Sequence, residues 1–130
     1  MSSAWASGYT GSHVQIAIVD DGLEWRHPDL IDRFSSRGSI DIIGKSVDPQ
    51  PQSGESHGTA SASVAVASMN SWCGVGVAPL AKVAGIRLLG GKVFDSDEAE
   101  ALSYRLELNS IYSNSWGPTD DGRRLEGPGV

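Results

Sequence analysis

The sequence predicts an α/β fold in which helices flank a parallel central sheet. Short, apolar, strand-like runs alternate along the chain with longer helical segments, and this alternation is typical of parallel sheets. The chain has 130 residues, of which 39% are hydrophobic and 20% charged, as in an ordinary globular domain. We therefore expect one domain that buries a core and collects its reactive groups at the carboxyl ends of the strands.

Four segments are predicted as strands from their apolar, partly β-branched composition. The first is a continuous apolar run that is typical of a fully buried strand, and the third runs into two glycines. In chain order the expected strands cover residues 14–19, 40–43, 82–89 and 110–113.

Two helices are predicted between these strands. Residues 57–70 are dense in alanine and other small residues, which suits a helix packed closely against a sheet. Asp95 and Glu98 resemble a capping box that opens a second helix, running to about residue 108. The segment 45–56 is rich in proline, glycine and serine and is expected to be a loop.

Charge and composition narrow the possible partners. The formal net charge is −6 and the sequence pI is about 4.8, which argues against a nucleic acid or an anionic membrane as a partner. No apolar run approaches the ~20 residues of a membrane span, and the N-terminus lacks the charged and apolar regions of a signal peptide. The single cysteine, Cys73, is either a buried thiol or half of a disulfide to a partner outside this chain.

The candidate catalytic residues are Asp20 and His57. Asp20 and Asp21 end the first expected strand, and His57 opens the alanine-rich helix. A buried aspartate that faces a histidine fixes the orientation of the imidazole, which then serves as a general base for a nucleophile. The spacing alone fits an equally simple alternative, in which the two aspartates cap a turn and His57 caps the helix.

Several sequence blocks, in order along nearly the whole chain, resemble the kexin/furin-type proprotein convertases of the subtilisin-like serine proteases. They are "IAIVDDGLEWRHPDL", "SHGT", "CGVGVAP" and "YSNSWGPTDDGRRLEGPG". The resemblance implies a subtilisin-like fold and a serine endopeptidase that cleaves polypeptides after basic residues, in the secretory pathway or outside the cell. It assigns Asp20 to orient His57 and places Asp21 near the substrate groove.

The resemblance also implies that the chain is a truncated, N-terminal portion of a catalytic domain, because such domains are roughly twice this long or more. The nucleophile block of the family, Gly-Thr-Ser-x-Ala/Pro, and its oxyanion-hole residue lie further downstream and are absent from residues 1–130. We expect this fragment to be inactive alone. A pseudo-protease or a calcium-stabilised binding module is the alternative. An aspartyl phosphatase is a weaker one, since Gly22 stands where that family needs a second aspartate.

The resemblance implies calcium as a cofactor. Calcium prefers six to eight hard oxygen ligands, and the family's ligands correspond to Asp29, the Asn70 side chain and the backbone carbonyls of Ala67, Trp72 and Gly74. A second site is suggested by Asp41 and Asp48, with Ser46 at the position of a third ligand. Taken alone, Asp29 reads equally well as a turn cap.

The C-terminal segment corresponds to the family's substrate-binding loop. An extended peptide would add as a strand along Ser115, Trp116 and Gly117. Asp120 corresponds to the acid at the base of the first specificity pocket, and Glu126 to an acid further along the groove. Their ordinary interpretation is that they are turn and surface residues.

Overall fold

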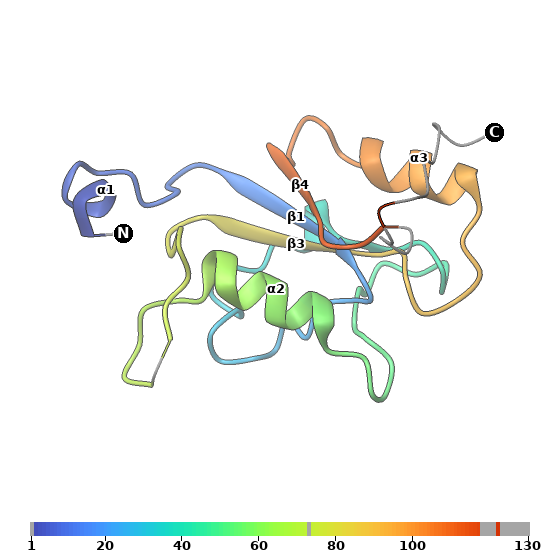
Figure 1. Ribbon diagram of the computed structural model, residues 1–130, viewed down its shortest axis with the longest axis horizontal. Helices are drawn as coiled ribbons and strands as arrows, with labels where there is room; N and C mark the ends of the chain where they lie inside the picture. The colour runs from blue at the N-terminus through green and yellow to red at the C-terminus, as the bar shows by residue number, and fades with distance from the viewer. Residues whose placement is uncertain (1, 73, 118–121, 123–130) are drawn as a thin grey trace.

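The core of the structure is one parallel sheet of four strands, in the order β2-β3-β1-β4 (Figure 1). In this computed structural model the strands are β1 Gln15–Asp20, β2 Ile40–Asp41, β3 Lys82–Arg87 and β4 Ile111–Asn114. The structure describes residues 2–72, 74–117 and 122. Each neighbouring pair of strands is parallel, so the predicted parallel α/β architecture is confirmed.

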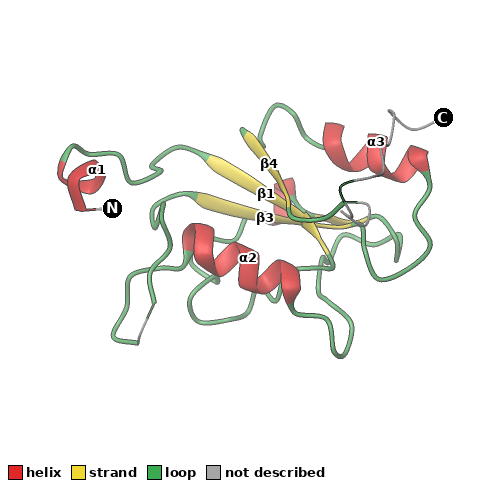
Figure 2. Cartoon of the chain, viewed as in Figure 1, coloured by secondary structure: helices red, strands yellow, loops and turns green. Residues whose placement is uncertain are grey.

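Helices α2 and α3 cover opposite faces of this sheet (Figure 2). Successive residues of a strand point to opposite faces, so β1 sends Ala17 and Val19 into one core cluster and Ile18 into the other. The first cluster includes Ala101 of α3 (Asp95–Ser103). The second includes Ala62 of α2 (His57–Val66). The sheet is therefore buried on both sides, which explains why its central strands read as continuous apolar runs.

Helix α2 ends at Val66, earlier than the predicted end at residue 70. Ala67 leaves the helical conformation, with φ −47° and ψ 130°. The next backbone N–H, that of Ser68, donates to the carbonyl of Asp29 at 2.8 Å, and Gly76 N–H donates to the carbonyl of Ala67 at 2.9 Å. Contacts with distant segments thus end the helix, although its small residues would allow it to continue.

Helix α3 begins at Asp95, as predicted, but ends at Ser103. Its N-terminus is capped by Asp97, whose carboxylate accepts a hydrogen bond from the backbone N–H of Phe94 at 3.0 Å. The expected capping pair of Asp95 and Glu98 is therefore wrong. Beyond the helix, Arg105 has a φ of 56°, a left-handed conformation that cannot continue an α-helix.

The remaining helical segments are short. They are α1 Ser2–Ala6 and the 3₁₀ helix η1 Ser36–Gly38.

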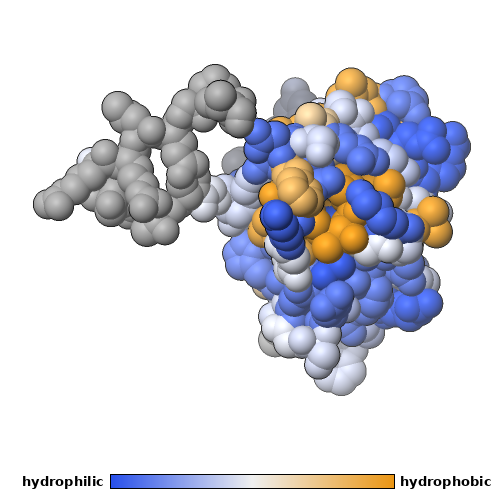
Figure 3. All heavy atoms as spheres, turned by 90° about the vertical axis from the view of Figure 1, so that its right-hand side faces the viewer, coloured by the Kyte–Doolittle hydropathy of each residue, from blue (hydrophilic) through white to orange (hydrophobic). Residues whose placement is uncertain are grey.

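On the face that carries α3, an apolar patch is surrounded by hydrophilic surface (Figure 3). Phe94, Leu102 and Leu106, in and beside α3, are 54%, 44% and 65% exposed. Within the described part of the chain, no helix has the length and apolar composition needed to cross a membrane.

Candidate active site

Asp20 and His57 meet at the carboxyl end of the sheet. Asp20 is the last residue of β1 and is 1% exposed, whereas His57 opens α2 and its side chain is 59% exposed. Nδ1 of His57 lies 2.9 Å from both carboxylate oxygens of Asp20. Because an ionised carboxylate only accepts hydrogen bonds, Nδ1 carries the proton and donates it. The imidazole is thus held on its inner side and exposed on its outer side.

The backbone around Asp20 is fixed by the neighbouring strands. The carbonyl of Asp20 accepts hydrogen bonds from the backbone N–H groups of Leu88 and Leu89, just after β3, at 2.9 and 3.1 Å. Its carboxylate also accepts the N–H of Asp21 at 2.8 Å. These contacts hold the buried carboxylate in one orientation. The hydrogen bonds that the carboxylate accepts from Asp21 and His57 offset the loss of its hydration.

Gly58 allows the start of α2 to approach β1 closely. A Cβ added at this position would lie 2.3 Å from the carbonyl oxygen of Gly22 and 2.8 Å from Cβ of Asp20. Any side chain here would push the helix away from the strand end, and His57 would move with it. The small residue after His57 is therefore needed for the contact between the two candidate catalytic residues.

Asp21 caps helix α2. Its two carboxylate oxygens accept hydrogen bonds from the backbone N–H groups of His57 and Gly58, at 3.0 and 2.7 Å. A negative charge at a helix N-terminus is favourable because it pairs with unsatisfied N–H groups and with the helix dipole. The role of Asp21 in substrate binding stays a prediction.

The surroundings of His57 increase its basicity. The hydrogen bond that His57 donates to Asp20, then the negative charge of Asp20, raise the pKa of His57 above its usual value of 6.5, and the negative charge of Asp21 adds a smaller effect in the same direction. Partial desolvation opposes them. A more basic imidazole accepts a proton more readily, as a general base requires.

Most of the residues expected to bind calcium lie together near the end of α2. Asp29, Ala67 and Gly74 line one hollow of about 360 Å³, and Trp72 lines a neighbouring hollow that also includes Asp29. Asn70 donates a hydrogen bond from its amide nitrogen to the carboxylate of Asp29. The carboxylate and carbonyls suit a hard cation, whereas Asn70 suits it only with its amide oxygen turned toward Asp29.

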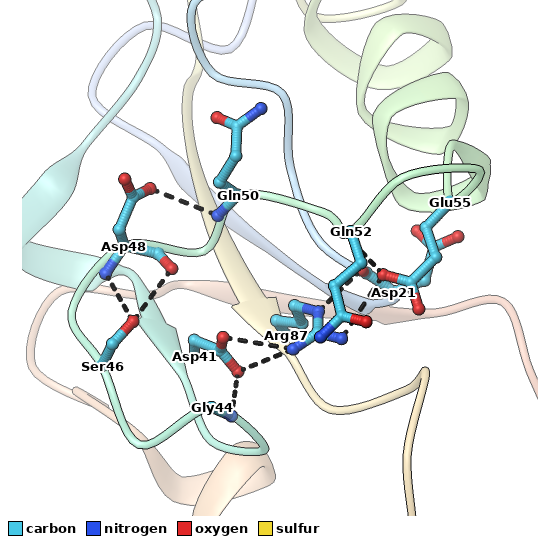
Figure 4. A network of polar contacts seen from close by, with 9 residues as sticks. All are labelled: Asp21, Asp41, Gly44, Ser46, Asp48, Gln50, Gln52, Glu55 and Arg87. Carbon is cyan, nitrogen blue, oxygen red and sulfur yellow. Dashed lines mark hydrogen bonds and ion pairs between the residues drawn. The ribbon is translucent and has the colours of Figure 1, made fainter.

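The expected second calcium site, formed by Asp41 and Asp48, does not fit the structure. The carboxylate of Asp41 is engaged by Arg87 at 3.2 and 3.3 Å, and Asp48 accepts hydrogen bonds from Trp25 and from the backbone of Gln50. The two carboxylates have separate partners (Figure 4). The guanidinium beside Asp41 would also repel a cation.

Part of the expected substrate-binding segment follows the edge strand β4. Ser115 and Gly117 are exposed, and the indole N–H of Trp116 donates to the carbonyl of Val19 in β1 at 2.8 Å. This contact ties the segment to the strand that carries Asp20. Asp120 and Glu126, the other two residues expected to bind substrate here, lie outside the described residues, as does Cys73.

One residue near the site, Arg87, is missing from the functional residues predicted from the sequence. It ends β3 and is 1% exposed. The sequence feature that could have identified it is its position in the apolar run "KVAGIRLL", which is expected to be a buried strand. A charged residue is almost never fully buried without a partner, so an arginine there indicates a buried ion pair.

A parallel sheet that joins a strand-end aspartate to a helix-start histidine is an arrangement found in serine hydrolases with a catalytic triad. The subtilase family, Peptidase_S8, matches residues 11–129, and the chain belongs to this family.

Similar proteins include a dibasic-processing endoprotease of Schizosaccharomyces pombe, 46% identical over 129 residues, and kexin of Saccharomyces cerevisiae, 48% identical over 126 residues. These matches cover 98% and 95% of this chain but only 18% and 16% of the two relatives. The crystal structure of a serine protease of Aeromonas sobria aligns with a TM-score of 0.76 and 33% identity, over 85% of this chain and 19% of that protein. The chain thus spans about a fifth of the length of these proteins.

Proposed function

We propose that residues 1–130 form the N-terminal part of the catalytic domain of a serine endopeptidase that processes proproteins after basic residues. The observation that carries this proposal is the contact of 2.9 Å between Nδ1 of His57 and the buried carboxylate of Asp20. The names of the relatives, a dibasic-processing endoprotease and kexin, support the substrate class. An enzyme that processes proproteins would act in the secretory pathway or outside the cell.

In the proposed mechanism, Asp20 accepts a hydrogen bond from Nδ1–H of His57 and holds the proton on that nitrogen, so Nε2 is the basic nitrogen. Nε2 takes the proton of a serine hydroxyl as its oxygen attacks the peptide carbonyl, and then returns a proton to the leaving amine. Asp20 stabilises the imidazolium that forms between these steps. The serine and the oxyanion donor would come from polypeptide beyond the 130 residues. We use "complete enzyme" for a protein that contains both.

We also propose that calcium stabilises the loop after α2 through Asp29, Asn70, Ala67, Trp72 and Gly74. The hollow lined by Asp29, Ala67 and Gly74 supports this placement. Bound calcium would supply structural stabilisation there by linking the loop to the turn that contains Asp29.

Calcium is expected to raise the melting temperature of the complete enzyme by roughly 5 °C or more over its value in chelator. Asp29→Ala should abolish most of this difference, because it removes the carboxylate of the site. Asp32→Ala, which deletes a nearby exposed carboxylate, should preserve it. A wild-type melting temperature that does not respond to calcium would rule out the site.

Asp120→Asn is expected to reduce kcat/KM for peptides with arginine at the cleaved bond by roughly 10²-fold or more, because an arginine left unpaired in a desolvated pocket is strongly unfavourable. Peptides with leucine at this position should be affected much less. Asp121→Asn makes the same chemical change one residue further on and serves as the matched control. A wild-type preference for leucine, or an arginine preference that survives Asp120→Asn, would contradict the assignment of this pocket.

A further inference from the structure

Arg87 lies beside the strand end that carries the candidate active site. It ends β3 opposite Asp20 of β1 in the register of the sheet, and its side chain is 1% exposed. A fully buried guanidinium is costly unless hydrogen-bond acceptors surround it. Resting on the function proposed above, we propose that Arg87 is a positioning residue, which aligns His57 with Asp20 through two separate connections.

The guanidinium reaches three different segments of the chain (Figure 4). Nε donates to the backbone carbonyl of Asp21 at 3.2 Å. Nη1 donates to the carboxylate of Asp41 at 3.2 and 3.3 Å, and Nη2 to that of Glu55 at 3.4 Å. Only arginine presents donors in three fixed directions within one plane, so lysine cannot reproduce these contacts.

The first connection runs through Asp21. Arg87 holds the carbonyl of this residue, whose carboxylate accepts the backbone N–H groups of His57 and Gly58. The N–H of Asp21 in turn donates to the carboxylate of Asp20. Asp21 thus contacts both members of the candidate catalytic pair, and Arg87 fixes the peptide group from which its side chain projects.

The second connection runs through Glu55, two residues before His57. Its Oε2 accepts both Nη2 of Arg87 and the backbone N–H of Gln52, the latter at 2.8 Å. The N–H of Glu55 donates back to the carbonyl of Gln52 at 3.0 Å. These contacts anchor the turn that leads into α2, so Arg87 restrains His57 from the loop side as well.

The cluster is tightly enclosed by the chain that follows β3. Gly90 has a φ of 97°, and a Cβ there would lie 2.0 Å from Oε1 of Glu55 and 2.9 Å from Nη2 of Arg87. The side chains of Asp41 and Glu55 are only 10% and 19% exposed. Loss of the cation would leave two poorly solvated carboxylates without their partner, so Arg87 also contributes to stability.

The test must therefore separate positioning from stability. Arg87→Lys keeps the positive charge beside Asp41 and Glu55 but cannot make all three contacts. In the complete enzyme it should lower kcat by roughly 10²-fold, the expected effect of a misplacement of about 1 Å, with KM within about twofold. Arg87→Met, which also removes the charge, should lower kcat further.

Asn109→Ala provides the control for simple destabilisation. Asn109 is buried near the start of β1, where it bonds Gln15 and the carbonyls of Gly38 and Tyr104, far along the strand from Asp20. At a temperature where all variants are folded, Asn109→Ala should keep the wild-type kcat. NMR titration of His57 supplies a readout without turnover, since a looser contact with Asp20 should move its pKa in Arg87→Lys toward the usual value.

Two failures can be told apart. An inactive wild-type complete enzyme would overturn the proposed function, and the role of Arg87 with it. An active wild type with an unchanged kcat and His57 titration in Arg87→Lys would overturn the role of Arg87 alone. A kcat that falls equally in Arg87→Lys and Asn109→Ala would also overturn it, since destabilisation would then explain the loss.

Discussion

His57→Ala is expected to lower kcat of the complete enzyme by roughly 10⁶-fold, the size of effect found when the histidine of a catalytic triad is removed. The reason is that no other group in the described structure is placed to take a proton beside Asp20. The fold should survive, because the imidazole is 59% exposed and its removal leaves little cavity. Steady-state kinetics with a basic peptide and a thermal melt measure the two effects.

His13→Asn is the matched control for His57→Ala. His13 is an exposed histidine with a φ of 67°, and asparagine tolerates this left-handed conformation. The control removes an imidazole elsewhere and should leave kcat unchanged. A His57→Ala enzyme that retains more than about a hundredth of the wild-type kcat would exclude His57 as the general base.

Asp20→Asn is expected to reduce kcat by roughly 10⁴-fold, because the amide no longer fixes the productive tautomer or stabilises the imidazolium. The pH profile should also change. His57 must be neutral to accept a proton, so the rate rises as pH passes its pKa, which Asp20 raises. Without this negative charge the pKa falls, and the acidic limb of kcat/KM against pH should move to lower pH. A limb that does not move would show that Asp20 does not control His57.

The central strands are the part of the fold that the sequence predicts best. Residues 14–19 and 82–89 are expected as strands, and the structure has Gln15–Asp20 and Lys82–Arg87. Both are buried on two faces, so their apolar composition alone identifies them. The second strand is shorter than expected, since it covers only Ile40–Asp41 before an antiparallel bridge from Asp41 to Ser46 turns the chain.

Helix ends are harder to predict because distant contacts determine them. The backbone N–H of Ser68 bonds Asp29, which lies far away in the sequence, and this contact takes the chain out of α2. The composition of the residues around Ser68 does not indicate this contact. The end of α3 is followed by a left-handed Arg105, a conformation that arginine gives no reason to expect.

The candidate site shows the same division between local and distant information. Asp20 and His57 are 37 residues apart, and their contact is expected only from the resemblance to a family, since spacing also allows two unrelated caps. The partners of Arg87 come from three separate segments. No local pattern joins them, so only the folded structure shows that the arginine connects to the pair.

The contact between Asp20 and His57 couples proton binding to the stability of the fold. Because the pKa of His57 is higher in the folded chain than its usual 6.5, the native state binds a proton more tightly than the unfolded state does. This contribution to stability is complete at pH values below the unfolded pKa, and it is lost as pH rises through the folded pKa. Catalysis needs the opposite form, with His57 neutral. Acidification toward the unfolded pKa would therefore add the stabilising contribution of this one contact while it lowers the activity of the complete enzyme, and a rise in pH would restore the activity as that contribution is lost.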